Sequence, residues 1–174
     1  EKYHEGIICL SACLAGSVNQ ALLNGQNEKA EEIAKYIFEL VKQYNIPPYN
    51  EENQTGKIRH IVIKIGIRTN EVMCVVVTNE KKIEREDELV NNIINKFPEV
   101  KTVIKNINNK NTNVILGKEN IILYGSGYIF DKLGNYKFKI SPQSFYQINP
   151  SQTEILYNTA INSIIKDKEN LKDK

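Results

Sequence analysis

The chain has 174 residues, of which 41% are hydrophobic, so it can form one domain or two small ones around an ordinary core. Its formal net charge of +2 is too small to indicate a nucleic-acid partner, so such a claim must rest on local clusters of cations. No apolar run approaches the roughly 18 residues of a membrane span. Three cysteines without a signal peptide favour a reducing, cytoplasmic setting.

The first quarter of the chain contains one clear element. Residues 1–25 mix short apolar runs with small residues, and their periodicity leaves strand and helix open. Residues 27–44 predict an amphipathic helix, because apolar side chains recur at helical spacing and charged ones occupy the other faces. Pro47 and Pro48 end this helix, and the polar residues 50–56 form a connection. The apolar positions are Ala30, Ile33, Ala34, Ile37, Val41 and Tyr44.

Two strands joined by a turn are predicted next. In residues 58–68 isoleucines alternate with His60, Lys64 and Arg68, which is the period of a strand with one buried face and one wet, basic face. The turn 69–71 leads into the continuous apolar run 72–78, which fits a central strand better than an edge strand. Together these segments predict a β-hairpin.

The following segments complete an α+β fold. Residues 89–97 predict a second amphipathic helix, and residues 100–107 predict another strand. Residues 121–124, 128–133 and 136–140 predict short strands, the last two joined across Gly134 and Asn135. The predicted fold class is therefore α+β, a small mixed sheet with two or three packed helices.

The last predicted helix begins with Asn149 as its N-cap and Pro150 at its first position. Beyond Lys166 the charged sequence predicts a solvated tail. The helix is expected to bury its apolar residues, which are Leu156, Tyr157, Ala160, Ile161 and Ile164.

A run of positive charge is the first candidate for a functional site. Residues 57–68 contain no acid. On one exposed strand face their cations could neutralise phosphates and position an RNA backbone. The alternative is a solvated sheet face without a ligand. The residues concerned are Lys57, Arg59, Lys64 and Arg68, together with His60.

The second candidate is the triplet Phe145, Tyr146 and Gln147, which precedes the last predicted helix. Aromatic rings can stack on a base or a cofactor, an amide can read a polar group, and a helix N-terminus favours anions. Aromatic side chains at such a junction more often belong to the core, so this alternative stays open.

The cysteines and histidines predict neither a catalytic residue nor a metal site. Cys9 and Cys13 have no second Cys/His pair nearby, so buried small side chains are favoured over metal ligation. Cys74 lies in an apolar strand, which favours a core thiol over a nucleophile. His4 and His60 are too few and too far apart for a hydrolytic metal centre.

Residues 41–157 resemble the bacterial RNA (uracil-5-)-methyltransferases that modify 23S ribosomal RNA. The third of the four motifs that carry the resemblance contains the asparagine-rich residues 104–113, which by composition alone fit either a genome bias or a functional loop. The motifs are TGKIRHIVIKIG, EVMCVVVTN, EVKTVIKNINNKNTNVILG and SPQSFYQINPSQTEILY.

The resemblance implies roles for a few residues. Gln147 corresponds to the glutamine that borders S-adenosyl-L-methionine, and Phe145 to the neighbouring aromatic residue that faces the site. Arg59 and His60 correspond to a basic strand close to the RNA. The family attacks C6 of a flipped uracil with a cysteine thiolate, methylates C5 and then removes the C5 proton. Its glycine-rich cofactor loop and nucleophile are expected beyond residue 174, so this chain is expected to be inactive alone.

Residues 3–37 resemble instead a piece of the PHP domain of the bacterial DNA polymerase III α subunit, through YHEGIICLSACLAG, QALLNG and EKAEEIAK. The expected organisation is a fusion, natural or an artefact: a PHP-like fragment (1–38), a methyltransferase central domain (41–140) and the start of a catalytic domain (141–174). The alternatives are a non-catalytic RNA-binding module and a polymerase-associated phosphoesterase fragment. Ribosomal RNA is the expected partner, and no membrane is expected.

Overall fold

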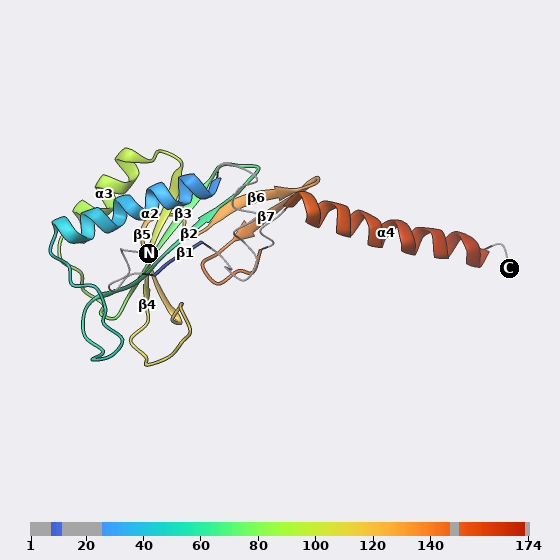
Figure 1. The fold of residues 1–174 in the computed structure, drawn as a ribbon. Helices are drawn as coiled ribbons and strands as arrows, with labels where there is room; N and C mark the ends of the chain where they lie inside the picture. The colour runs from blue at the N-terminus through green and yellow to red at the C-terminus, as the bar shows by residue number, and fades with distance from the viewer. Residues whose placement is uncertain (1–7, 12–25, 147–149, 173–174) are drawn as a thin grey trace.

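The computed structural model describes residues 8–11, 26–146 and 150–172, which form three helices and seven strands (Figure 1). Within the ambiguous first 25 residues, residues 8–11 form a strand. The elements are β1 (Ile8–Ser11), α2 (Gln26–Gln43), β2 (Ile58–Ile65), β3 (Val72–Thr78), α3 (Glu86–Lys96), β4 (Val100–Ile107), β5 (Glu119–Gly125), β6 (Ile129–Leu133), β7 (Tyr136–Ile140) and α4 (Pro150–Lys172).

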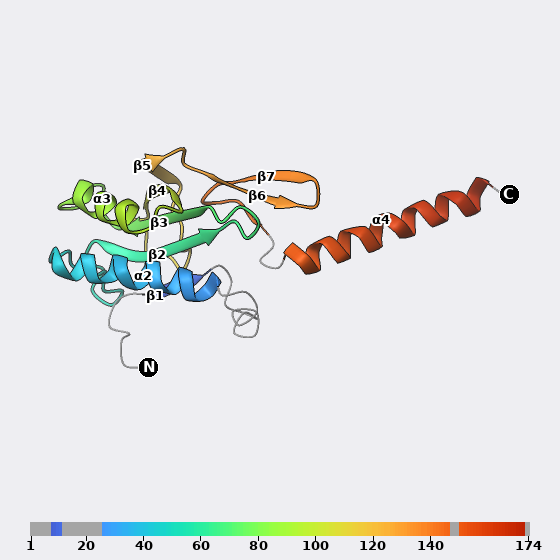
Figure 2. The same ribbon diagram turned by 90° about the horizontal axis from the view of Figure 1, so that it is seen from above.

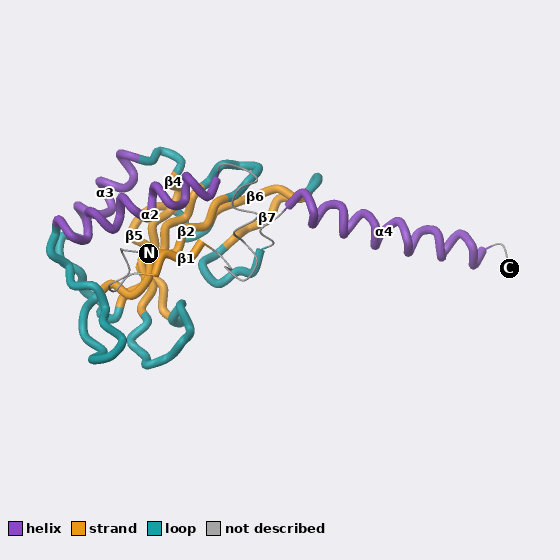
Figure 3. Tube along the Cα trace, in the orientation of Figure 1, coloured by secondary structure: helices purple, strands orange, loops and turns teal. Residues whose placement is uncertain are grey.

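Five strands form one mixed sheet in the order β1-β2-β3-β4-β5, and β6 pairs with β7 in a separate hairpin (Figure 3). The pairs β1/β2 and β3/β4 are parallel, whereas β2/β3 and β4/β5 are antiparallel. The predicted hairpin is thus confirmed as β2/β3. The run 72–78 is confirmed as a central strand, since β3 is the middle strand and every one of its residues is buried. The α+β fold class is confirmed.

Helices α2 and α3 cover one face of this sheet (Figures 1 and 2). The predicted apolar stripe of α2 packs there, with Ile33, Ile37 and Val41 all 1% exposed or less. The stripe of α3 adds Leu89 and Ile93, and the Asn92 amide donates to the Tyr44 hydroxyl at 2.7 Å between the two helices. Both helices therefore belong to the same core.

The hairpin β6/β7 packs against the opposite face of the sheet. Ile129 and Ile140 join a second apolar cluster with side chains from β2, β3 and β4. Strand β2 is buried over most of its length, and Arg59 and His60 are only 5% and 7% exposed. The expectation of a wet, basic face on this strand is wrong, because alternation reports two faces but does not say that either faces water.

The last helix differs from its prediction in two ways. It continues through Lys172, where a solvated tail beyond Lys166 was expected. Only its first turn packs on the hairpin, with Pro150 and Thr153 buried, and the rest extends away from the sheet (Figures 1 and 2). The expected burial of its apolar residues is wrong: Leu156, Tyr157, Ala160, Ile161 and Ile164 are all exposed.

Among the helices of the described residues, none combines the length and the hydropathy needed to cross a bilayer.

Candidate functional site

The turn that joins β7 to α4 is closed by two serines. The Ser144 amide donates to the Ser141 carbonyl at 3.1 Å, and the Ser141 amide donates to Ser144 Oγ at 3.0 Å. Pro142 is buried between them. Phe145 follows with 85% of its surface exposed, so the fixed turn presents an open aromatic ring. Gln147 and Asn149 lie outside the described residues.

Lys64 ties this turn to the main sheet. Its ammonium donates to the carbonyl oxygens of Ser141 at 3.2 Å and Ser144 at 2.8 Å. Burial lowers the pKa of Lys64, since the charged form loses part of its hydration. Lys64 was predicted as a free cation that binds phosphate, but in the structure its ammonium is bound to the backbone of the turn.

The turn between β2 and β3 holds the hairpin in place. The buried Asp131 carboxylate accepts from the amides of Ile67 at 3.0 Å and Arg68 at 2.8 Å. On the neighbouring residue of β6, the Thr69 hydroxyl donates to the Phe130 carbonyl at 2.5 Å, and Glu71 accepts from the Phe130 amide at 2.7 Å. Four hydrogen bonds therefore fix β6, and with it the turn before α4, to the sheet.

Tyr146 belongs to this junction and not to an open site. Its ring lies 5.9 Å from the ring of Phe138 and packs against the second apolar cluster. Burial, together with the nearby Asp131 carboxylate, raises the pKa of Tyr146 to about 12. Of the predicted triplet, Tyr146 is half-buried against the second apolar cluster and Phe145 lies at the surface.

Glu154 anchors the first turn of α4. One of its carboxylate oxygens accepts from the Gly134 amide at 2.8 Å, and the other pairs with Arg68 at 3.2 Å. Gly134 has a φ of +55° at the tip of the hairpin, a conformation that glycine adopts without strain. Arg68, which is exposed, thus takes part in holding α4.

Arg59 organises the asparagine-rich loop. Its Nη1 donates to the carbonyls of Asn108 at 2.9 Å and Lys110 at 2.7 Å, and the guanidinium lies 4.4 Å from the centre of the Tyr49 ring. Next to it, burial and then the Arg59 charge lower the pKa of His60. Neither side chain is available at the surface for a backbone phosphate.

Two asparagines hold the asparagine-rich loop in place through hydrogen bonds to its backbone. The Asn106 amide donates to the Gly117 carbonyl at 3.0 Å and accepts from the Gly117 amide at 2.6 Å. The Asn108 amide donates to the carbonyls of Val114 at 2.6 Å and Ile115 at 3.0 Å. Both asparagines are buried, so a compositional bias of the genome does not by itself account for them: each has a structural role.

The five predicted RNA-binding positions are not brought together. Lys57, at the start of β2, forms ion pairs with Glu84 and with Glu80. Lys64 lies at the other end of the strand, about 23 Å away at 3.3 Å per residue. Lys64 bonds the carbonyl of Ser144, next to Phe145, and Arg68 bonds Glu154 in the first turn of α4.

The described residues supply no other reactive centre. Cys74 is fully buried, and burial raises its pKa well above the ordinary range, as expected for a core thiol. The Cys9 side chain and all of Cys13 lie outside what the structure describes. In the described part of the chain, no group of three or more His, Cys, Asp or Glu could hold a metal ion.

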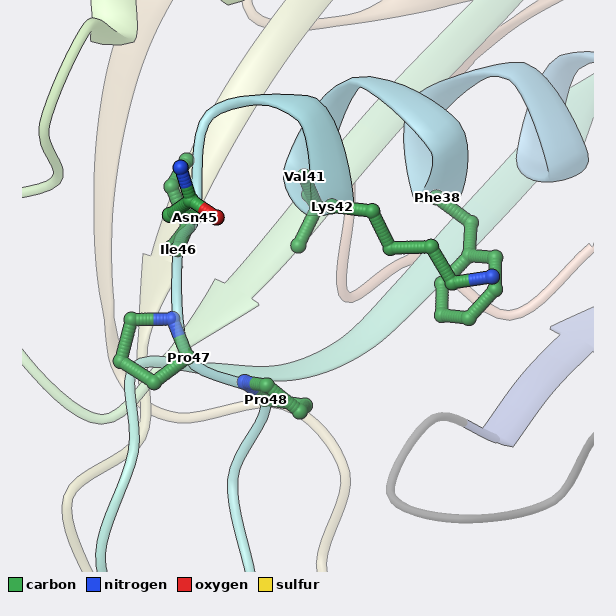
Figure 4. Close-up of a pocket in the computed structure, with 7 residues that line it drawn as sticks. All are labelled: Phe38, Val41, Lys42, Asn45, Ile46, Pro47 and Pro48. Atoms are coloured by element: carbon green, nitrogen blue, oxygen red, sulfur yellow. The ribbon is translucent and has the colours of Figure 1, made fainter.

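A hollow of about 340 Å3 lies where α2 ends (Figure 4). Lys42 is the only charged residue among the seven that line it, and its ammonium sits 4.1 Å from the centre of the Phe38 ring. The hollow lacks converging polar groups and is far in the fold from the turn before α4. The lining residues are Phe38, Val41, Lys42, Asn45, Ile46, Pro47 and Pro48.

Sequence reasoning missed the lysines of the hairpin. Lys132, Lys137 and Lys139 are exposed on β6 and β7. The sequence signal was the strict alternation of YKFKI, which predicted a strand with lysines on one face. The RNA-binding cations were instead assigned to residues 57–68, because that run contains no acid.

Part of the chain is homologous to RNA methyltransferases. Over 136 residues, 78% of the chain, it is 43% identical to an uncharacterized RNA methyltransferase of Clostridium tetani, and the match covers 30% of that protein. A second, from Oceanobacillus iheyensis, is 37% identical over 153 residues, which are 88% of the chain and 33% of that protein. The chain thus spans about a third of the length of the curated relatives it matches.

The fold matches part of the solved structure of Pyrococcus abyssi tRNA (uracil-54, C5)-methyltransferase in complex with S-adenosyl-L-homocysteine. The TM-score is 0.63 at 24% sequence identity, over 77% of this chain and 31% of that chain. At this identity the likeness shows the fold: the arrangement of sheet, helices and hairpin occurs within a uracil methyltransferase.

The family model of the PHP domain matches residues 1–48. These residues and the 136 residues of the methyltransferase match exceed 174 in total, so the two matches overlap. Helix α2 lies within residues 1–48, yet it packs on the same sheet as α3. The chain therefore combines, in one fold, similarity to a third of an RNA methyltransferase with similarity to a PHP domain in its first 48 residues.

Proposed function

We propose that the chain is part of an S-adenosylmethionine-dependent RNA (uracil-5-)-methyltransferase that acts on 23S ribosomal RNA. Residues 41–140 are its central domain, residues 141–174 begin its catalytic domain, and residues 1–38 are a PHP-like segment. The observation that supports this most is 43% identity over 136 residues to an RNA methyltransferase. The resemblance of the sequence motifs supports ribosomal RNA as the substrate.

The proposal gives the turn before α4 the role of bordering the cofactor. S-adenosylmethionine would supply the methyl group there, with Gln147 at its edge. The exposed ring of Phe145 fits this role, because it leaves an aromatic face open beside a backbone held by Lys64 and the two serines. RNA contacts by Lys57, Lys64 and Arg68 would require each cation to exchange a protein partner for a phosphate.

Methyl transfer by this chain alone is not part of the proposal. The only thiol whose side chain the structure describes is Cys74, and it is buried with a raised pKa. A nucleophile for C6 of uracil must be an accessible thiolate. We expect no transfer of labelled methyl from S-adenosylmethionine to RNA when the purified chain is assayed alone.

A chimera tests the function itself. Residues 41–157 of this chain replace the corresponding segment of the Clostridium tetani relative, and transfer of tritiated methyl to uracil in ribosomal RNA is measured against the parent protein. We expect the chimera to methylate C5 of uracil, and Gln147→Ala within it to lower the rate by about tenfold or more. Gln143→Ala is the matched control in the same turn, since Gln143 is exposed and bonds Asn120 at 3.0 Å.

Two results contradict the proposal. A chimera that binds S-adenosylmethionine as the parent does but methylates no uracil would exclude the function for this segment. Equal losses for Gln147→Ala and Gln143→Ala would remove the cofactor role from Gln147 while leaving the family intact.

A second candidate function follows from the PHP match at residues 1–48. It is metal-dependent phosphoester hydrolysis by the first part of the chain. The match to RNA methyltransferases covers 78% of the chain, whereas the PHP match is confined to residues 1–48, which favours the first proposal. Hydrolysis of a nitrophenyl phosphodiester by the purified chain with manganese or zinc, abolished by chelation, would favour the second.

A further inference from the structure

The outer face of the hairpin β6/β7 carries cations and rings together. Opposite residues of the two strands share a face, and the register pairs Phe130 with Lys139 and Lys132 with Lys137. Tyr128, two residues before Phe130, continues the same face. We define the hairpin outer face by its five residues, which are Tyr128, Phe130, Lys132, Lys137 and Lys139.

This face looks away from the core. The alternate residues of β6, which are Ile129, Asp131 and Leu133, are all buried on the other side and hold the hairpin to the sheet. The three lysines are exposed, and Figure 2 shows the hairpin extending beyond the ends of β2 and β3. The lysines of the outer face are therefore open to a partner, and the rings of Tyr128 and Phe130 are half-buried beside them.

The charge of the hairpin outer face is not neutralised within the described part of the chain. The one acid in residues 128–140 is Asp131, on the opposite face. Lys132, Lys137 and Lys139 form no ion pair with any described residue, whereas Lys57 and Arg68 of the β2 region do. The two carboxylates that bond the hairpin from outside it, Glu71 and Glu154, accept from the amides of Phe130 and Gly134 and form no ion pair with these lysines.

The rings supply a second kind of contact. The ammonium of Lys137 lies 3.7 Å from the centre of the Phe130 ring, and that of Lys139 lies 3.8 Å from the centre of the Tyr128 ring. The two rings meet edge to face at 5.3 Å. A base can stack on such a ring when the flexible lysine moves to the adjacent phosphate, a combination typical of single-strand binding.

We propose that the hairpin outer face binds single-stranded RNA and holds it beside the turn before α4. The commitment to RNA rests on the proposed function. Single strands are favoured over duplexes because only unpaired bases expose a face for stacking. Lys139 is two residues from Ser141, so RNA on this face lies next to the turn that presents Phe145.

The test is binding of a fluorescein-labelled 12-nucleotide oligouridine to the full chain, followed by fluorescence anisotropy over a series of salt concentrations. The variant K137Q/K139Q should bind about tenfold more weakly, and the slope of log affinity against log salt should become shallower by about 1.4, or 0.7 for each lost phosphate contact. Tyr128→Leu should weaken binding about fivefold or more without changing the slope, since stacking involves no counterions.

The matched control is K42Q/K96Q. It removes the same charge and likewise takes two ammonium groups from aromatic rings, since Lys42 lies 4.1 Å from the Phe38 ring and Lys96 lies 4.2 Å from the Tyr36 ring. Both lysines are on the helical face of the sheet. Affinity should change less than about twofold. All lysines concerned are exposed, so circular dichroism should show the same fold in both variants.

Three results overturn the inference: no binding by the unaltered chain, equal losses in the two double variants, or binding of a 12-base-pair duplex as tight as that of the single strand. The outcome is separable from the proposed function. An active chimera that is indifferent to K137Q/K139Q would reject this surface alone. Hairpin-dependent binding by a chain whose chimera is inactive would reject the methyltransferase alone.

Discussion

Strand β2 and the hairpin outer face both present alternating cations, but the two regions use them differently. Arg59 and Lys64 direct their charges to backbone carbonyls, and Lys57 to two glutamates. Lys137 and Lys139 meet only aromatic rings among the described residues. The cations of β2 are therefore structural, and those of the hairpin are free for a ligand.

The difference shows why a count of charges along a strand is a weak guide to a binding surface. The cations of the acid-free run 57–68 are bound by groups distant in sequence: Lys57 pairs with Glu84, and Arg59 donates to the carbonyl of Lys110. The hairpin has the same period of two. Its outer cations form no ion pair with a described residue, and the acids that contact the hairpin, Asp131, Glu71 and Glu154, bond backbone amides instead.

The largest effect expected is on the stability provided by Arg59. Arg59→Gln should lower the free energy of unfolding by about 3 kcal/mol, since the carbonyls of Asn108 and Lys110 lose a charged donor. Urea denaturation measures this. Lys137→Gln, an exposed cation without an ion pair among the described residues, is the matched change and should cost less than about 0.5 kcal/mol. Similar costs for the two variants would show that the division into structural and free cations is wrong.

A smaller loss is expected at Lys64. Lys64→Met keeps the apolar stem but removes both hydrogen bonds to the turn, so we expect about 1.5 kcal/mol of destabilisation. Hydrogen exchange should become faster at the amides of Ser141 and Ser144 in particular. Unchanged exchange there, at equal global stability, would mean that the two serines close the turn without Lys64.

The main lines of the fold could be predicted from the sequence. Periodicity located α2, α3 and the strands, because each buries one apolar stripe or face. The exposure of most of α4 could not be predicted, because an apolar stripe shows that a helix can pack but not what it packs against. Likewise the five-stranded sheet needed the pairing of β1 with β2, which the mixed pattern of residues 1–25 did not contain.

The candidate site could be predicted only in part. The sequence indicated the aromatic residues before α4 but left open whether they are buried or exposed, and it favoured a core thiol at Cys74. It also assigned RNA contacts to Arg59 and His60. The burial of Arg59 could not be predicted, because the carbonyl that binds it comes from a loop distant in sequence. The anchoring of the hairpin by Asp131 carries no sequence signal, since a lone acid in a strand fits a solvated position equally well.

His60 gives the β2 region a pH dependence. Burial lowers the pKa of His60 in the folded state. Below pH 6.5 the unfolded chain therefore binds a proton at His60 more readily than the folded chain does. Stability should therefore be full above pH 6.5 and fall as the pH drops below it, by at most about 1.4 kcal/mol at pH 5.5. His60→Gln should remove this fall between pH 7.5 and 5.5. A variant that keeps the same profile would assign the loss to other groups.

Arg68 is the β2-side cation closest to being free, and it gives the smallest expected effect. Its guanidinium is exposed and pairs with Glu154 at 3.2 Å, so Arg68→Gln should cost less than about 0.5 kcal/mol. Oligouridine affinity should change less than about twofold, because the pair already satisfies the charge. Glu154→Gln is the reciprocal variant: it frees Arg68, and the amide oxygen of the new side chain can still accept from the Gly134 amide. If Arg68→Gln weakened binding as much as K137Q/K139Q does, the RNA surface would extend from the hairpin onto the β2–β3 turn, and the boundary between structural and free cations would move with it.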